Sequence, residues 1–251
     1  MGALHAGHRA LLDLARSECD HLTLSIFVNP LQFGPNEDLA RYPRPIEADL
    51  ALAQAAGVDQ VFLPSVEEMY QASPTTIHVP EITDRWEGAS RPGHFDGVAT
   101  VVAKLFGIVG AERAYFGQKD LQQCLVVRKM THDLSLPVTL VFAPTVREAD
   151  GLARSSRNVY LSDSERRIAP QLYGTLRDCA TEIADGKDVD EVLRSHLDRL
   201  NAAGFLPEYL AYVDTRTLSP LTRFQQQSAL IVAAKLGRTR LIDNVLLANA
   251  L

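Results

Sequence analysis

Strand-like and helix-like segments alternate over the first 144 residues, and this alternation limits the possible folds more than any other feature. Four short runs rich in apolar, β-branched and aromatic residues have the character of buried strands, and apolar residues recur at helical spacing between them. This order favours a parallel sheet with helices on both faces, because parallel strands need long crossover connections. We therefore predict a Rossmann-like, doubly wound α/β fold. The predicted strands are 22–28, 59–64, 113–116 and 137–144, and the predicted helices are 45–57, 97–110 and 121–134.

The rest of the chain has a different pattern. Ser162 and Glu165 form a capping box that begins a helix, and Pro170 is expected to break that helix because it lies beyond the first turn. A second helix is predicted over 189–204, followed by a strand and a hairpin that turns near 235–238. Helices followed by antiparallel strands indicate a smaller α+β domain. We predict a Rossmann-like domain over 1–147 and a smaller α+β domain over 148–251.

Charge and cysteine content exclude several classes of function. The net charge is −6 and there is no run of Lys or Arg, which argues against binding to nucleic acid or to an anionic membrane. No apolar run is long enough to cross a bilayer, and the beginning does not resemble a signal peptide. The 3 cysteines are widely spaced and form no CxxC pair, which is typical of a reducing compartment. We expect a cytoplasmic protein whose partners are small molecules.

The sequence His5-Ala6-Gly7-His8 stands where a helix is predicted to begin. Unpaired N–H groups and the helix dipole favour anions at such a position, and two imidazoles add further donors. Gly7 would let a ligand approach the backbone closely. Two surface histidines on a first helical turn are an equally good interpretation of this tetrapeptide alone. A zinc site is less favoured, because the HExxH spacing and a third ligand are missing.

Two further segments have residues suited to phosphate. Residues 116–120 come at the end of a predicted strand and contain Gly117, Lys119 and Asp120, although an ordinary connecting loop with a solvated Lys is the favoured interpretation of this stretch alone. Residues 151–158 combine two hydroxyls with the planar fork of Arg157, which suits an anion, although a linker could have the same sequence.

Neutral amides follow the same strands. Asn29 and Gln32 come just after the strand 22–28, and Gln122 and Gln123 begin the helix after 116–120. Because ligands bind beyond the carboxyl ends of parallel strands, these groups should share one rim of the sheet. Together they predict a site where phosphate-binding groups face a polar, uncharged part of a substrate.

Seven motifs spread over the whole chain resemble the pantothenate synthetase (pantoate–β-alanine ligase) family, which belongs to the HxGH-bearing nucleotidyltransferases. These motifs are MGALHAGH, FVNPLQFG, YPR, RPGHFDGVATVV, YFGQKDLQQ, PTVREADGLARSSRNVYL and LIVAAKLGRTRLIDN. The resemblance implies ATP-dependent condensation of pantoate with β-alanine through a pantoyl adenylate, with Mg²⁺ as cofactor and a homodimer as the assembly.

The resemblance also implies roles for individual residues. The catalytic residues would be His8, His5, Lys119 and Arg157, and pantoate or β-alanine would contact Gln32, Gln123 and Asn29. Asp49 and Asp120 would bind Mg²⁺. The residues expected along ATP are Met1, Gly2, Ala3, Leu4, His5, Gly7, His8, Gly117, Gln118, Lys119, Asp120, Val146, Arg154, Ser155, Ser156 and Arg157.

The sequence departs from the family pattern at several points. Gln118 replaces the usual Glu, Arg154 replaces an apolar residue, and Asp96 stands where Arg is frequent. Family members also have a strand that leads into the MGALH motif, and we expect it to precede Met1 in the full protein. A chain without it is expected to be poorly soluble or weakly active. Two other hypotheses are kept. One is a nucleotidyltransferase of the same superfamily that acts on a different substrate, and the other, suggested by the missing strand, is a nucleotide-binding protein with impaired catalysis.

Overall fold

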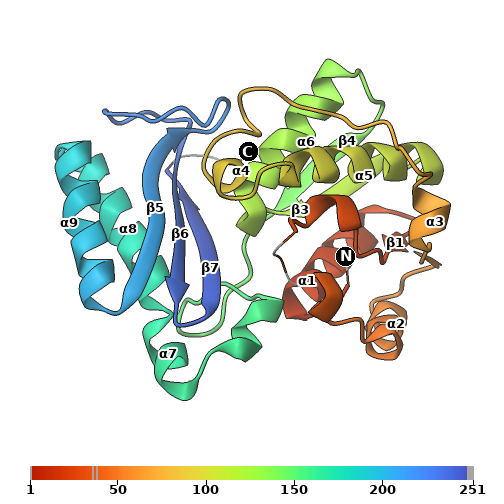
Figure 1. The fold of residues 1–251 in the computed structure, drawn as a ribbon, viewed down its shortest axis with the longest axis horizontal. Helices are drawn as coiled ribbons and strands as arrows, with labels where there is room; N and C mark the ends of the chain where they lie inside the picture. Colours follow the sequence, from red (N-terminus) through yellow and green to blue (C-terminus); the bar gives the residue numbers. More distant parts are fainter. Residues whose placement is uncertain (1, 36, 38, 248–251) are drawn as a thin grey trace. The chain divides into compact units, whose positions relative to one another are not determined.

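The computed structural model describes residues 2–35, 37 and 39–247. The chain divides into two compact units, one made of Met1–Gln118 and Gln122–Pro144 and the other of Lys119–Leu121 and Thr145–Leu251. Figure 1 draws the first mainly in red to green and the second mainly in green to blue. The first unit contains parallel strands and helices, and the second contains helices and an antiparallel sheet, which confirms the predicted fold class.

The strands of the first unit form two parallel pairs. Strand β1 (Thr23–Ser25) pairs with β2 (Gln60–Phe62), and β3 (Arg113–Gly117) pairs with β4 (Thr139–Ala143). Strand β1 is shorter than predicted, because its ladder with β2 covers three residues and is continued by one bond, from Ile26 N–H to the Phe62 carbonyl. Within the described residues, no strand pairing joins the two pairs into a single sheet.

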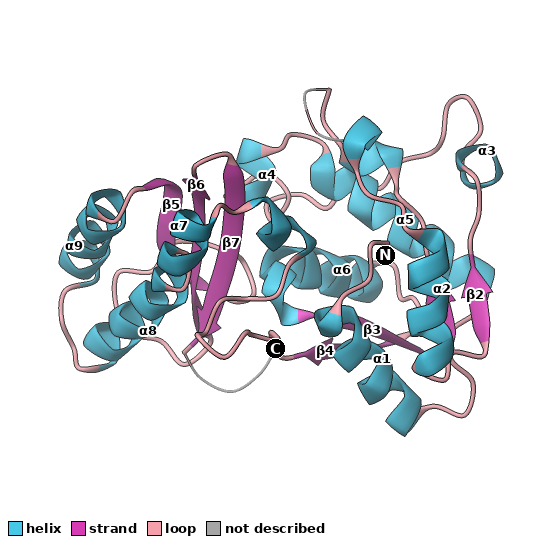
Figure 2. Cartoon of the chain, turned by 90° about the horizontal axis from the view of Figure 1, so that it is seen from below, coloured by secondary structure: helices cyan, strands magenta, loops and turns pink. Residues whose placement is uncertain are grey.

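Within the described residues, six α-helices and two short 3₁₀ helices connect and cover the strands of the first unit, and a third 3₁₀ helix, η3, begins in the first unit and continues into the second. Figure 2 shows α1 and α6 on opposite sides of the β3–β4 pair. The helices are α1 (Ala6–Glu18), α2 (Ile46–Ala55), α3 (Val66–Met69), α4 (Glu87–Ser90), α5 (His94–Val109), α6 (Leu121–Asp133), η1 (Pro30–Gln32), η2 (Leu39–Arg41) and η3 (Gln118–Asp120).

The buried apolar residues of α1, β1 and α2 form one core. Leu12 and Ala15 on α1 pack with Leu24 of β1 and Ala53 of α2, and each of the four is at most 3% exposed. This cluster explains which face of α1 turns toward β1, because the apolar side chains of an amphipathic helix are buried against the core. Most side chains of β3 and β4 are only partly buried, unlike the fully covered strands expected from the sequence.

The second unit is a three-stranded antiparallel sheet covered by helices. Strands β5 (Phe205–Asp214), β6 (Ser228–Leu236) and β7 (Thr239–Leu246) lie in that order, so β6 is central. The predicted hairpin turn and the break at Pro170 are confirmed, because β6 and β7 are joined at Gly237 and α7 and α8 are separated at Pro170. The helical elements are η4 (Ser156–Tyr160), α7 (Asp163–Ile168), α8 (Gln171–Ala184) and α9 (Val189–Ala202).

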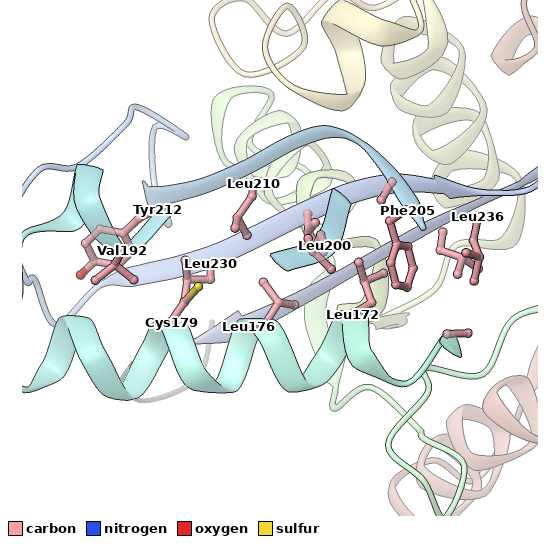
Figure 3. Close-up of a cluster of buried hydrophobic side chains, with 14 of the residues drawn as sticks. Leu172, Leu176, Cys179, Val192, Leu200, Phe205, Leu210, Tyr212, Leu230 and Leu236 are labelled. Carbon is pink, nitrogen blue, oxygen red and sulfur yellow. The ribbon is translucent and has the colours of Figure 1, made fainter. Parts of the chain in front are cut away.

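The core of this unit is almost entirely apolar. Leu172, Leu176 and Cys179 project from α8 toward the strands, where they meet residues such as Phe205 and Leu230 (Figure 3). Phe205 is 1% exposed and Leu230 is fully buried. This apolar core holds the strands and helices of the second unit together.

Across the described residues, no helix combines the length and the hydropathy needed to span a bilayer.

Candidate functional site

His5 and His8 hold each other at the N-terminus of α1 by reciprocal capping. The Nδ1 atom of His5 accepts the backbone N–H of Gly7 at 3.1 Å, and the Nδ1 atom of His8 accepts the backbone N–H of His5 at 3.2 Å. The ring centroids are 4.1 Å apart. Because each Nδ1 accepts, a neutral ring carries its proton on Nε2, which is then a donor. Two such donors at a helix N-terminus suit an anionic ligand.

Asp49 fixes the backbone just before this helix, a role that was not predicted from the sequence. Its two carboxylate oxygens accept the N–H of Ala3 at 2.9 Å and the N–H of Leu4 at 2.6 Å. Ala3 has a φ of 50°, a conformation that is costly for a residue with a Cβ. Asp49 is 2% exposed. The available signal was an acidic residue among the apolar positions of 45–57, where a buried carboxylate needs partners.

Asn29 organises the loop that contains Gln32. Asn29 is 2% exposed, and its Nδ2 group donates to Gln32 Oε1 at 3.3 Å and to the Gly97 carbonyl at 3.0 Å. Its Oδ1 atom accepts the N–H of Leu31 at 3.2 Å and the hydroxyl of Tyr70 at 2.8 Å. The amide of Asn29 is therefore occupied within the protein on both sides. This geometry favours an effect of Asn29 on a ligand through Gln32, and its predicted direct contact stays a prediction.

Gln122 and Gln123 differ in their surroundings although they are neighbours on α6. Gln122 donates to the carbonyls of Ile82 and Arg85 at 2.7 and 2.8 Å, and it accepts the N–H of Glu87 at 3.1 Å. It therefore fastens the segment before α4 to α6, and its amide is fully used there. Gln123 is half-buried and remains the predicted substrate-binding residue of the two.

Gly117 and Gln118 lie at the end of β3 and the beginning of η3. Gly117 has open space where a Cβ would be, so a ligand could approach its backbone. Gln118 donates from Nε2 to the Phe142 carbonyl at 3.3 Å.

Lys119 and Asp120 continue η3 and are grouped with the second unit. The Lys119 carbonyl accepts a hydrogen bond from the side-chain amide of Asn244 at 2.9 Å. The Nζ atom of Lys119 lies 3.8 Å from Asp120 Oδ1. The backbone is thus fastened to β7, while the side chain has one loose ion-pair contact.

The segment from Val146 to Arg157 folds back on itself. The N–H of Arg154 donates to the Val146 carbonyl at 2.9 Å, which brings two predicted ATP-binding residues together. Ser155 caps η4 by accepting the N–H of Arg157 at 3.3 Å, and Ser156 is the first residue of η4. Arg154 pairs with Glu148 at 2.9 Å, so its charge has a partner within the segment. Within the described part of the chain, the guanidinium of Arg157 has no ion-pair partner.

An ion pair that was not predicted from the sequence anchors this segment. Arg147 donates from Nη1 and Nη2 to the two oxygens of Asp243 at 2.6 and 2.9 Å. Its guanidinium also stacks on Tyr173, 3.5 Å from the ring centroid, and donates to the Gly151 carbonyl. The Asp243 side chain is 2% exposed. The motifs TVREADG and LIDN contained these residues, but spacing alone does not pair positions so far apart.

The two predicted Mg²⁺ ligands differ in their fit to a cation. Both oxygens of Asp49 already accept backbone N–H groups, so this buried carboxylate fits Mg²⁺ poorly. Asp120 fits better, because its side chain is 51% exposed and Mg²⁺ commonly takes one carboxylate beside substrate phosphates. Over residues 2–35, 37 and 39–247, no three His, Cys, Asp or Glu side chains are grouped as metal ligands. Met1, predicted to contact ATP, lies outside the described residues.

Comparison with known proteins identifies the family. The sequence model described as pantoate-beta-alanine ligase matches residues 1–246. The pantothenate synthetase of Chloroflexus aggregans is 52% identical over 98% of this chain and 91% of its own length. That of Thermus thermophilus is 53% identical over 98% of this chain and 90% of its own length.

Solved structures agree with the sequence comparison. The crystal structure of pantothenate synthetase from Thermus thermophilus matches with a TM-score of 0.94 and 52% identity, over 99% of this chain and 91% of that one. Pantoate-β-alanine ligase from Francisella tularensis, complexed with β-γ ATP and β-alanine, matches with a TM-score of 0.81 and 34% identity, over 98% of this chain and 87% of that one. The resemblance stated from the motifs is confirmed, and this chain belongs to the pantoate–β-alanine ligase family.

Proposed function

We propose that this protein condenses pantoate with β-alanine at the expense of ATP, giving pantothenate, AMP and pyrophosphate. The observation that carries the proposal is the match to the ligase family over residues 1–246. The Francisella relative complexed with β-γ ATP and β-alanine supports two of the three substrates. The reaction needs an anion-binding group for the nucleotide and neutral groups for pantoate, and the chain has residues suited to both.

In the first step the pantoate carboxylate attacks the α-phosphorus of ATP, and pyrophosphate leaves. Negative charge then grows on the phosphate oxygens, and donors aimed at those oxygens stabilise the transition state more than the ground state. We assign this work to His8 and His5, supported by the capping that leaves Nε2–H of each neutral ring as a donor. Lys119 and Arg157 would add positive charge, and Ser155 and Ser156 would add hydroxyl donors.

In the second step the β-alanine amine attacks the acyl carbon of pantoyl adenylate, the amide forms, and AMP leaves. Before that, Gln32 and Gln123 would hold pantoate through its hydroxyl groups and leave its carboxylate free to react. Neutral amides suit this task, because a cation bound to the carboxylate would lower its nucleophilicity. The hydrogen bond from Asn29 to Gln32 supports the role given to Gln32.

Three finer features are also proposed. Asp120 would hold Mg²⁺, which neutralises charge on the ATP phosphates when bound. The protein would act as a homodimer in the cytoplasm, with residues 1–147 binding ATP and pantoate and residues 148–251 forming a lid. Light scattering of the purified protein would test the dimer, and activity titrated with Mg²⁺ for Asp120→Asn beside the unaltered enzyme would test the metal ligand.

One assay tests the reaction itself. The protein is incubated with ATP, Mg²⁺, pantoate and β-alanine, and AMP is measured. We expect AMP only when both pantoate and β-alanine are present, and exchange of labelled pyrophosphate into ATP with pantoate alone. Exchange that does not depend on pantoate would assign a different substrate, and ATP binding without exchange would indicate a binding protein with impaired catalysis.

A further inference from the structure

The backbone carbonyl of Gln32 is held by two side chains from the RPGH motif at residues 91–94, a motif to which no role was given. His94 Nδ1 lies 2.7 Å from this oxygen, and Arg91 Nη2 donates to it at 3.3 Å. Gln32 is the last residue of η1, where a carbonyl lacks a partner within the helix. The direction of the chain at Gln32 therefore depends on these two residues.

The contact between Arg91 and His94 sets the tautomer of the imidazole. Arg91 Nη1 lies 3.1 Å from His94 Nε2. A guanidinium can only donate, so Nε2 must accept and the proton of a neutral ring must be on Nδ1. This Nδ1–H group is the donor that the Gln32 carbonyl accepts. Burial, and then the neighbouring Arg91 charge, lower the pKa of His94, which keeps the ring neutral.

Arg91 is itself fixed by two acidic residues. It donates from Nε and Nη2 to the two oxygens of Glu37 at 2.7 and 2.6 Å, and its Nη1 lies 3.5 Å from Glu87 Oε1. Its side chain is 16% exposed. The N–H of Glu87 is bound to Gln122, which adjoins Gln123 on α6. Glu87 thus connects Arg91, which holds the Gln32 carbonyl, with Gln122 on α6.

Gly97 brings α5 close enough for these contacts. A Cβ at this position would overlap the Leu31 carbonyl and the Gln32 nitrogen. The Gly97 carbonyl also accepts the Asn29 amide at 3.0 Å. The loop 29–32 is therefore packed directly on the backbone of α5. His94, the first residue of α5, and Arg91, the C-cap residue of α4, meet this loop at Gln32.

We infer that Arg91 and His94 are positioning residues for Gln32 and thereby set the affinity of the enzyme for pantoate. This inference rests on the proposed function, because it takes Gln32 as a pantoate ligand. Neither residue is assigned a contact with substrate. Their effect is to hold the Gln32 carbonyl, and with it the side chain, in the geometry that binds.

The test compares His94→Ala, His94→Asn and Arg91→Lys in the full chain. The Asn amide can replace Nδ1–H, whereas Ala cannot, and Lys cannot bind Glu37 with two parallel bonds while reaching the imidazole. His78→Ala is the matched control, because His78 is also bonded to a side chain, Asp96, but is 53% exposed and does not contact Gln32. The Michaelis constants for pantoate and ATP are measured by pyrophosphate exchange, together with the melting temperature.

We expect His94→Ala and Arg91→Lys to raise the Michaelis constant for pantoate about ten-fold, with that for ATP changed less than two-fold. His94→Asn should recover most of the loss, and His78→Ala should behave like the unaltered enzyme. An unchanged pantoate constant in His94→Ala overturns the inference. Equal losses for both substrates without recovery in His94→Asn also overturn it, since that result assigns His94 to general folding.

The pH profile of the unaltered enzyme gives an independent measurement. The charged groups that face His94 are Arg91, Glu87 and Glu37. Protonation of Nε2 would remove the acceptor for Arg91 and place two cations together. The pantoate constant should therefore rise as the pH falls through the lowered pKa of His94, and this acid rise should be absent in His94→Asn. An acid rise of equal size in both proteins overturns the inference.

The same assay separates the two proposals. If the unaltered enzyme shows no pantoate-dependent exchange, the proposed function fails. If it shows exchange and the variants at 91 and 94 bind pantoate normally, only the positioning role fails.

Discussion

The interior of the second unit and the site-bearing loops of the first are held together by different forces. Around β5–β7, seventeen of the described residues are buried in one apolar core. In the first unit, the segments at 2–8 and 29–32 are fixed by buried polar side chains, Asp49 and Asn29, that bond to backbone. Apolar burial is strong but has no direction, whereas hydrogen bonds fix orientation. Stability and substrate geometry should therefore respond to different substitutions.

The largest expected effect tests the apolar half of this comparison. Phe205→Ala should lower the free energy of unfolding by about 3–5 kcal/mol, because it leaves a cavity in a closed core. The Michaelis constants measured well below the melting temperature should not change. The neighbouring Leu206→Ala is the control, since Leu206 is 64% exposed and its loss should change stability by less than about 0.5 kcal/mol. Urea unfolding measures both, and a large change in substrate affinity in Phe205→Ala would break the comparison.

At the N-terminus of α1, we expect the main loss to be in turnover. His8→Ala should lower turnover about 10²–10³-fold, or about 2.7–4 kcal/mol, as for loss of one donor to a developing oxyanion. ATP binding should weaken much less, and Lys119→Ala should behave similarly. His132→Ala is a suitable control, because its side chain is 88% exposed on α6. Equal losses in turnover and ATP affinity would instead show a contact already made in the ground state.

The elements of the fold were easier to predict than their pairing. The helix that ends at Gly110, the capping box at Ser162 and the hairpin at Gly237 each depend on residues close together in sequence, and all three are present. The short ladder of β1 and the partial burial of β3 and β4 depend on which segments meet in space. Periodicity within one segment contains no information about its partner.

The candidate site divides in the same way. The motif at 5–8 indicated an anion site because its geometry is local, and the mutual capping of the two histidines spans only four residues. The partners Asp49, Arg147 with Asp243, and Arg91 with His94 were not predicted, because each acts on a segment distant in sequence or on a backbone atom. A charged residue within an apolar pattern was the available signal, and this signal does not indicate which residue the charge contacts.

Arg147→Lys examines a polar anchor of the second unit, the ion pair between Arg147 and Asp243. Lysine keeps the charge but loses both the double bond to Asp243 and the stacking on Tyr173. We expect a loss of stability of about 2 kcal/mol together with weaker ATP binding, because the anchored segment contains Arg154–Arg157. Arg166→Lys is the control, since its single bond to Asp150 is exposed. A loss of stability with ATP affinity unchanged would separate the anchor from the site.

The smallest expected effect concerns Tyr70, whose hydroxyl donates to Asn29 at 2.8 Å. Tyr70→Phe should raise the Michaelis constant for pantoate about five-fold, corresponding to about 1 kcal/mol for one neutral hydrogen bond.

Burial raises the pKa of Tyr70 to about 12, whereas an unfolded tyrosine ionises near 10, so the folded chain keeps this proton to a higher pH. Its contribution to stability is complete below pH 10 and is lost as the pH rises from about 10 to about 12. Urea unfolding across this range should show a steeper alkaline loss for the unaltered protein than for Tyr70→Phe. If stability falls equally with pH in the two proteins, Tyr70 is accessible to water and does not anchor Asn29. That result would argue against buried polar contacts as the determinant of substrate geometry in the first unit.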